Sequence, residues 1–120
     1  MGVHASPRSD DGAGIDTRIG DDELAALLAG CDADVVVAGH THDVTDRTIA
    51  RIRAVNLGSV SNPSRADRCA TYAIVHIDAD IHRIEQRVVD YDHAAVLRAI
   101  DDVAHPAGQY LRSFHTPQTT

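Results

Sequence analysis

Two histidines stand directly after an apolar run, in residues 35–44, VVVAGHTHDV. Imidazole is the commonest metal ligand, and loops at strand ends are where rigid folds present chemistry. Side chains two positions apart face the same side of an extended chain, and a turn between them would splay them toward adjacent ions. The spacing therefore makes His40 and His42 candidate metal ligands. A merely polar turn is the alternative reading of this short motif.

The elements before these histidines predict an α/β fold. Residues 34–38 are apolar and β-branched up to Gly39, which is typical of a buried strand. Residues 21–29, DDELAALLA, predict a short helix with Asp21 as its cap and Gly30 as its end. A helix that leads by a short loop into an apolar strand is characteristic of α/β proteins.

Downstream, the chain alternates between predicted strands and predicted helices. An Asn-Pro pair in a predicted loop separates two short strands from a later hairpin. Apolar residues at helical spacing follow the hairpin. The predicted segments are two strands within 47–59, a loop at 60–67, hairpin strands at 69–77 and 81–91, and helices at 93–103 and 107–114.

Composition narrows the class of protein. The chain has 120 residues, a formal net charge of -7 and an aliphatic apolar content without Trp. Its basic residues are scattered and form no basic stripe, so binding to nucleic acid or to an anionic membrane is not expected. The two cysteines lack Cys-x-x-Cys spacing, so neither a disulfide framework nor a thiolate zinc site is predicted. Because no signal peptide or membrane-spanning stretch is visible, we expect a cytoplasmic protein.

Three sequence blocks resemble the calcineurin-like metallophosphoesterases, in particular their small bacterial phosphodiesterase branch. The family's later blocks are a His-Gly-Ser-Pro-like loop, Gly-His-x-His and Asn-Pro-Gly-Ser. In the same order, this chain has His4-Ala5-Ser6-Pro7, Gly39-His40-Thr41-His42 and Asn56-Leu57-Gly58-Ser59. Ala5 and Leu57 replace the usual Gly and Pro without removing a ligand, although Ala5 would strain its loop if that position needed positive φ. The closing YDHAAVLRAI also resembles that branch, so the likeness spans nearly the whole chain.

This resemblance implies both a fold and a metal site. The fold is an α/β/β/α sandwich, to which this chain would contribute one mixed sheet with flanking helices. Residues 1–115 would form the C-terminal portion of the phosphoesterase domain, and residues 116–120 a tail. The resemblance implies that His4 and His40 bind one divalent ion and His42 a second. The ions would be Mn, Fe, Zn or Ni, and the substrate a small phosphate ester.

The family's oxygen ligands come from blocks that precede the equivalent of His4. They are an Asp-x-His, a Gly-Asp whose carboxylate bridges both ions, and a Gly-Asn-His. Here only Met1, Gly2 and Val3 stand before His4, and Gly20-Asp21 lies after it. We therefore expect at most one bound ion and no catalytic residue in this chain. We also expect little phosphoesterase activity from the chain alone and an apolar sheet face in contact with water.

Three functions remain open at this stage. The chain would be part of a phosphoesterase completed by an N-terminal half, a non-catalytic module that forms a homodimer, or a mononuclear zinc-binding protein. Asp43, beside His42, is a candidate for orienting an imidazole. The remaining histidines are read as structural or exposed, with a His76–His82 metal pair as an alternative; they are His76, His82, His93, His105 and, in the tail, His115.

Overall fold

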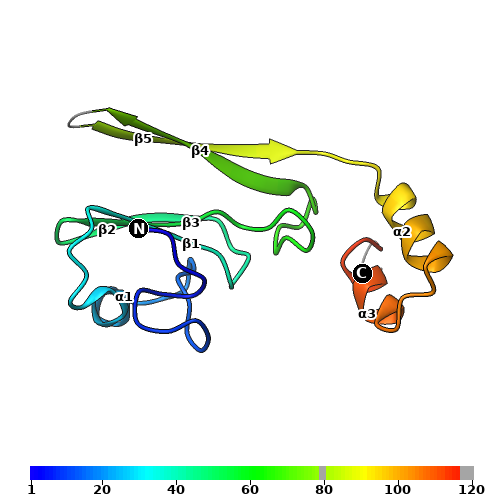
Figure 1. The fold of residues 1–120 in the computed structure, drawn as a ribbon, viewed down its shortest axis with the longest axis horizontal. Coiled ribbons are helices and arrows are strands. Elements are labelled where there is room, and N and C mark those ends of the chain that lie inside the picture. The colour runs from blue at the N-terminus through cyan, green and yellow to red at the C-terminus, as the bar shows by residue number, and fades with distance from the viewer. Residues whose placement is uncertain (79–80, 117–120) are drawn as a thin grey trace.

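The computed structural model describes residues 1–78 and 81–116, with the backbone alone for Ile81 and His82. The molecule is elongated, with extents of 46 × 30 × 28 Å. A hairpin lies over a small sheet, and two short helices extend to one side of both (Figure 1). The elements are α1 (Asp21–Leu28), β1 (Val35–Ala38), β2 (Thr45–Ile49), β3 (Ile52–Asn56), β4 (Ala70–Asp78), β5 (Ile81–Val89), α2 (His93–Asp102) and α3 (Gly108–Ser113).

The central sheet is mixed, as predicted. Its strand order is β1-β3-β2, with β1 parallel and β2 antiparallel to β3. Residues 1–3 run parallel beside β1, because Val3 N donates to Val37 O at 2.9 Å and Val37 N donates to Met1 O at 2.9 Å. His4 therefore ends an extended segment that lies next to the strand before His40.

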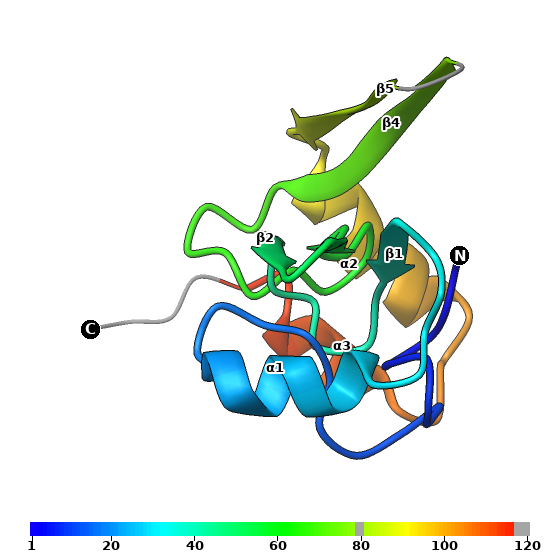
Figure 2. The same cartoon turned by 90° about the vertical axis from the view of Figure 1, so that its left-hand side faces the viewer.

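The core lies between this sheet and α1, which covers its lower face in Figure 2. Leu24 and Leu28 of α1 pack with Val36, Ala38 and Ala54 of the sheet. The other two valines of β1 face the hairpin side, where they line a cavity. Apolar side chains thus meet neighbours on both faces of β1, which is why its sequence is uniformly apolar instead of alternating.

The helix predicted at residues 21–29 ends one residue earlier, and its cap differs from the prediction. Gly20 is the N-cap residue and no side chain caps the helix. The prediction that Asp21 caps it is wrong, because the Asp21 carboxylate instead pairs with Arg47 of β2. Gly30 has φ 80° and stops the helix as predicted, since glycine adopts this left-handed geometry without steric cost.

The predicted hairpin forms a sheet of its own, facing the central sheet. β4 and β5 pair antiparallel, with His76 opposite Arg83 and Ile77 opposite His82. The His76 side chain lies 3.3 Å from a Glu85 oxygen. The alternative of a His76–His82 metal pair cannot be followed further, because the side chain of His82 is outside the described part of the chain.

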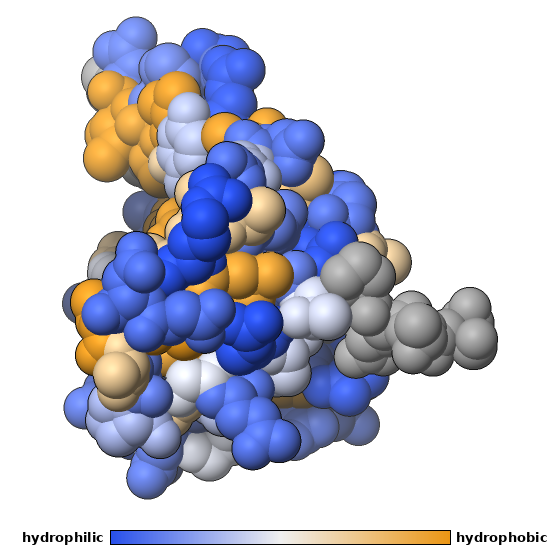
Figure 3. All heavy atoms as spheres, turned by 90° about the vertical axis from the view of Figure 1, so that its right-hand side faces the viewer, coloured by the Kyte–Doolittle hydropathy of each residue, from blue (hydrophilic) through white to orange (hydrophobic). Residues whose placement is uncertain are grey.

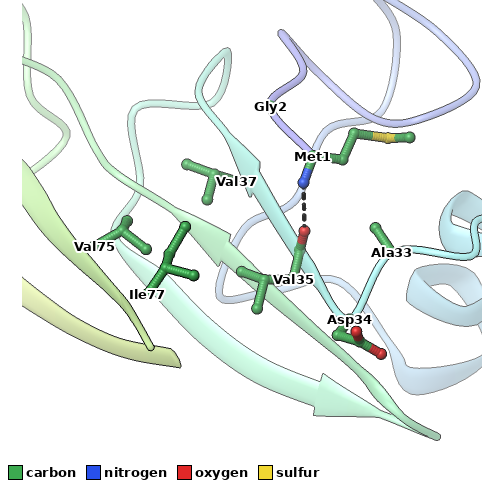
Figure 4. A pocket seen from close by; sticks show the side chains of 8 residues that line it. All are labelled: Met1, Gly2, Ala33, Asp34, Val35, Val37, Val75 and Ile77. Carbon is green, nitrogen blue, oxygen red and sulfur yellow. Dashed lines mark hydrogen bonds between the residues drawn. The ribbon is translucent and has the colours of Figure 1, made fainter. Parts of the chain in front are cut away.

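Apolar side chains are exposed on the hairpin, as expected for an open sheet face. Ile77 is 75% exposed, and Tyr72 and Val88 are also exposed. Figure 3 shows apolar atoms near the top of the molecule, where the hairpin lies, and further apolar atoms lower on the same face. A cavity of about 360 Å³ separates hairpin and sheet (Figure 4). It is lined by Met1, Gly2, Ala33, Asp34, Val35, Val37, Val75 and Ile77.

The two C-terminal helices pack on each other. The Asp92 side chain caps α2 by accepting a hydrogen bond from Ala95 N at 2.9 Å. Neither α2 nor α3 contains a buried residue. None of the helices in the described ranges is long and apolar enough to cross a membrane.

Candidate metal site

His4 and His40 meet at the ends of two adjacent extended segments. Gly39 N donates to His4 O at 2.9 Å, which keeps the two segments together up to the histidines. His4 Nε2 lies 3.2 Å from His40 Nδ1. The rings are arranged edge to face, with centroids 5.0 Å apart. The structure thus brings together the two residues predicted to share an ion.

The tautomer of His40 is set by a backbone carbonyl. His40 Nε2 lies 3.0 Å from Gly12 O, which can only accept, so Nε2 carries the proton. Nδ1 then keeps its lone pair on the side of His4. In a tetrahedral zinc site with Zn–N bonds of about 2.0–2.1 Å, two nitrogens lie about 3.3–3.4 Å apart. The spacing of His4 and His40 fits two ligands of one ion.

His42 is directed differently. Its Nδ1 lies 3.1 Å from Asn62 O and must donate to it, which leaves Nε2 as the free nitrogen. His40 has φ 65° and His42 has φ 60°, so the backbone turns at both residues. Within residues 1–78 and 81–116, no hydrogen bond or ring contact joins His42 to the other pair. That His42 binds a separate ion stays a prediction.

Asn56 holds the loop that carries these histidines, a role that the sequence reading did not assign. Its side chain is fully buried. Its Nδ2 lies 2.8 Å from Ile15 O, 2.5 Å from Gly39 O and 2.8 Å from Thr41 Oγ1, while its Oδ1 accepts from Gly58 N at 2.8 Å. The sequence feature that could have identified this role is an amide side chain at the end of an apolar strand, because a buried polar group there needs several hydrogen-bond partners.

Two glycines allow close packing around the site. Gly58 has φ 76°, and a Cβ there would lie 2.1 Å from Thr71 Oγ1. A Cβ on Gly14 would lie 2.7 Å from Thr41 Cγ2 and 3.0 Å from His40 Cδ2. The loop containing Gly14 therefore packs directly against the histidine loop, and a larger residue would push it away.

The same loop is stabilised by Asp16. Burial by itself raises the pKa of this carboxyl, but hydrogen bonds from the Arg18 side chain and from the backbone N–H groups of Arg18 and Ile19 lower the pKa overall. Arg18 Nη2 lies 2.7 Å from Asp16 Oδ2. The ionised Asp16 thus holds the turn that follows the stretch packed on His40.

The structure bears on two readings of individual residues. Among the described residues Asp43 makes no hydrogen bond to an imidazole, and its Oδ2 instead accepts from Thr17 N at 3.1 Å and from Thr17 Oγ1 at 2.6 Å. It ties the loop before α1 to the loop after β1. Ala5 is buried and is not among the described residues with positive φ, so it fits its loop without the strain that replacement of a glycine could bring.

The described side chains supply too few ligands to complete the coordination of one ion. Among the described residues, no three His, Cys, Asp or Glu side chains come together in a group that could hold a metal. Two imidazoles leave at least two positions of a tetrahedral site to water, substrate or other ligands. That carboxylate ligands are missing from the site stays a prediction.

A polar cavity of about 560 Å³ begins next to His42. Ser64, which lines it, donates its hydroxyl to His42 O at 3.0 Å. Arg65 and Arg68 also line it; the Arg65 guanidinium pairs with Asp67. The smaller apolar cavity under the hairpin, like the polar one, has none of the three candidate ligands in its lining.

Comparisons with solved structures find proteins of the same fold. The hypothetical protein PH1004 from Pyrococcus horikoshii OT3 is 18% identical and has a TM-score of 0.80 over 99% of this chain and 46% of its own. A metallophosphoesterase from Sphaerobacter thermophilus is 21% identical, with a TM-score of 0.73 over 98% of this chain and 54% of its own. These likenesses show a shared fold, and this chain spans about half the length of either protein.

No curated protein sequence matches the chain. The sequence profile of the calcineurin-like phosphoesterase superfamily domain matches residues 14–80, more than half of the chain. The matched region includes His40, His42 and Asn56, and His4 lies outside it. The predicted mixed α/β fold, part of a metallophosphoesterase sandwich, is confirmed by the structural likenesses. This chain belongs to the calcineurin-like phosphoesterase superfamily.

Proposed function

We propose that this chain provides the histidine side of a metal-dependent phosphoesterase centre. The observation that carries the proposal is the 3.2 Å approach of His4 Nε2 and His40 Nδ1. His40 has only one nitrogen available for an ion, because the Gly12 carbonyl occupies the other. Membership of the superfamily supports phosphate-ester hydrolysis as the reaction class.

The bound ion would be Mn, Fe, Zn or Ni. When bound, such an ion polarises a phosphoryl oxygen and lowers the pKa of a bound water. The chain's own residues hold the ligands in place. Asn56 fixes the turn between β1 and His40, and the Gly12 carbonyl fixes the His40 ring. The cavity beside His42, with Arg65 and Arg68 on its wall, is where we place a small phosphate ester.

We further propose that the chain alone hydrolyses phosphate esters poorly. The histidine pair has no carboxylate in its group within the described ranges, so a second ion at bridging distance lacks ligands. A complementing N-terminal half would supply those oxygens. The half-length coverage of both similar structures supports such a complement.

Metal binding tests the first proposal. We expect Zn²⁺ or Mn²⁺ to bind the purified chain in equilibrium dialysis, and one equivalent to be lost in His4→Ala and in His40→Ala. His105→Ala is the matched control, because His105 is an exposed histidine whose Nδ1 accepts from Ala107 N in the α2–α3 connection. Unchanged stoichiometry in both His4→Ala and His40→Ala would overturn the proposal.

Activity tests the second proposal. With Mn²⁺ and bis-p-nitrophenyl phosphate, we expect turnover of the purified chain close to the metal-only background. Addition of an N-terminal half from a related phosphoesterase should raise it, and His40→Ala should abolish that gain. Strong turnover by the chain alone that disappears in His40→Ala would refute the incomplete-site proposal while supporting phosphoesterase chemistry.

A non-catalytic dimer is the second candidate, favoured by the apolar side chains exposed on the hairpin. Gel filtration with and without Zn²⁺ separates it from a single-metal module. A dimer that persists in a chelator favours the dimerising module. A monomer that changes its elution only with Zn²⁺ favours the metal-binding one.

A further inference from the structure

A second pair of imidazoles lies in the C-terminal region of the molecule. His93 opens α2, and His115 follows the end of α3. Their Nδ1 atoms lie 3.3 Å apart. Tyr91 adds a third polar atom, because its hydroxyl oxygen lies 3.3 Å from the same His115 nitrogen. Two donor atoms from the segment at the start of α2 therefore lie within 3.3 Å of His115 Nδ1.

His115 is held firmly in this position. It is only 7% exposed, although the sequence places it with the tail. Arg68 Nη1 donates to its carbonyl at 2.5 Å, and its own N–H donates to Arg112 O at 3.0 Å. Tyr91 and His93 are partly buried, with ring centroids 4.2 Å apart. The cluster is thus ordered and still reachable from solvent.

The spacing fits metal ligands better than a hydrogen bond. A separation of 3.3 Å is long for a hydrogen bond from nitrogen, which is usually about 2.7–3.2 Å. It equals the distance of about 3.3–3.4 Å between two nitrogens on a tetrahedral zinc ion. The His4–His40 pair has nearly the same spacing.

The electrostatic surroundings keep His115 in the form that binds metals. Burial is the largest cause that lowers its pKa, and the neighbouring His93 and Arg68 lower it further. A neutral imidazole is the form that coordinates a metal, and a lowered pKa favours that form. Arg68 opposes a dication, and we therefore expect weaker binding than at a closed site of four protein ligands.

We propose that His93 and His115, with the Tyr91 hydroxyl as third ligand, form a second metal site for a borderline ion such as Zn²⁺. Imidazole nitrogen suits Zn²⁺, Cu²⁺ and Ni²⁺ better than Mg²⁺ or Ca²⁺. The ion would tie the start of α2 to the segment after α3. Because neither helix contains a buried residue, such a link supplies stability that packing there does not.

The experiment uses Zn²⁺ titrated into the full chain with the first site removed by His40→Ala. We expect the unmodified chain to bind two equivalents and His40→Ala to bind one. The remaining equivalent should disappear in His40→Ala/His93→Ala and in His40→Ala/His115→Ala. It should persist in His40→Ala/His105→Ala, which removes a histidine from the same helical region. Among the variants that carry His40→Ala, Zn²⁺ should raise the Tm only of His40→Ala itself and of the His105 control.

Tyr91→Phe keeps the ring and removes only the hydroxyl, so it tests the third ligand without disturbing packing. In the His40→Ala background it should weaken Zn²⁺ binding about tenfold, the usual order of loss when one supporting group of a metal site is removed. It should also change the visible spectrum of bound Co²⁺. Circular dichroism checks that the His115→Ala variant remains folded.

Failure of this inference and failure of the proposed function give different results. If His40→Ala abolishes all Zn²⁺ binding, the second site does not exist and the first stands. If His93→Ala and His115→Ala remove one equivalent while His4→Ala and His40→Ala remove none, the second site stands and the proposed function falls. Retention of the second equivalent in both His93→Ala and His115→Ala would overturn the inference.

Discussion

At the scale of single residues, one backbone carbonyl decides what His40 can bind. Gly12 O accepts from Nε2 and leaves Nδ1 unprotonated toward His4. Hydrogen bonds of this kind orient metal-binding histidines and raise their basicity. Gly12 is 28 positions away in the sequence, so the histidine motif could identify the ligand but not the tautomer.

Asn56→Ala tests the residue that holds the histidine loop. The change removes four hydrogen bonds of a fully buried amide, those to Ile15 O, Gly39 O and Thr41 Oγ1 and the one from Gly58 N, and each such loss costs about 0.5–1.5 kcal/mol. We expect the free energy of unfolding, measured in urea, to fall by about 2–4 kcal/mol, with weaker Zn²⁺ binding at the His4–His40 pair.

Ser61→Ala is the control for this prediction, because Ser61 is an exposed residue of the loop after β3. It should change the free energy of unfolding by no more than about 0.5 kcal/mol. Equal stability of Asn56→Ala and the unmodified chain would show that the loop does not depend on this amide.

At the scale of elements, parallel strands explain why distant sequence blocks meet. The segment before His4 runs parallel to β1, and β1 runs parallel to β3. Ala38 of β1 stands opposite Asn56 of β3. Parallel neighbours end at the same edge of the sheet, so the residues after each strand collect there. Both histidines and the amide that supports them come from this edge.

Asp46 and Arg53 join β2 to β3 and give the sheet a pH dependence. The hydrogen bond from Arg53 is the main cause that lowers the pKa of Asp46. A carboxyl with a lowered folded-state pKa stabilises the fold above its unfolded pKa of about 3.9, and the stabilisation is lost as pH falls through the folded pKa. The two side chains are 38% and 31% exposed, so solvent screening limits the effect.

Asp46→Asn should therefore lower the free energy of unfolding at pH 7 by about 0.5–1 kcal/mol. The difference from the unmodified chain should shrink as pH falls from about 4 through the lowered folded-state pKa of Asp46, below which the carboxyl is protonated in both states. Urea unfolding at a series of pH values measures this. A difference that stays constant from pH 7 to pH 2 would rule out the carboxylate as its origin.

At the scale of the whole molecule, the fold has a packed lower layer and an open upper one. α1 and the central sheet share one core, whereas the hairpin stands over a cavity of about 360 Å³. A hairpin of two strands is marginally stable by itself. Its exposed side chains Tyr72, Ile74 and Ile77 belong to the kind of apolar patch that marks an interface.

Ile77→Ser tests whether this face associates. Ile77 is 75% exposed beside the cavity, so the change removes apolar surface without loss of core packing. We expect gel filtration at high protein concentration to show less self-association. Tyr110→Ser, at a 66% exposed residue of α3, is the control and should leave the elution unchanged. Equal effects of both variants would argue against a specific interface on the hairpin.

Local sequence patterns were sufficient to predict the helices and strands and to identify the candidate ligands. Strand β1, helix α1 and its stop at Gly30 follow from side-chain periodicity and from backbone freedom, which depend on near neighbours. His4, His40 and His42 were identified because they stand at strand ends in a family pattern. The cap of α1 was missed because Arg47, far along the chain, pairs with Asp21.

Only the tertiary structure decided which side chains face one another. The structure brings together residues that are between 15 and 41 positions apart in the sequence. They meet in the His4–His40 pair, in the hydrogen bonds that the Asn56 amide donates and in the His93–His115 pair. Such contacts depend on strand register and on how helices return along the chain, and periodicity carries no information about either. That is why His115, which looks like part of a tail in the sequence, is the most buried histidine of its cluster.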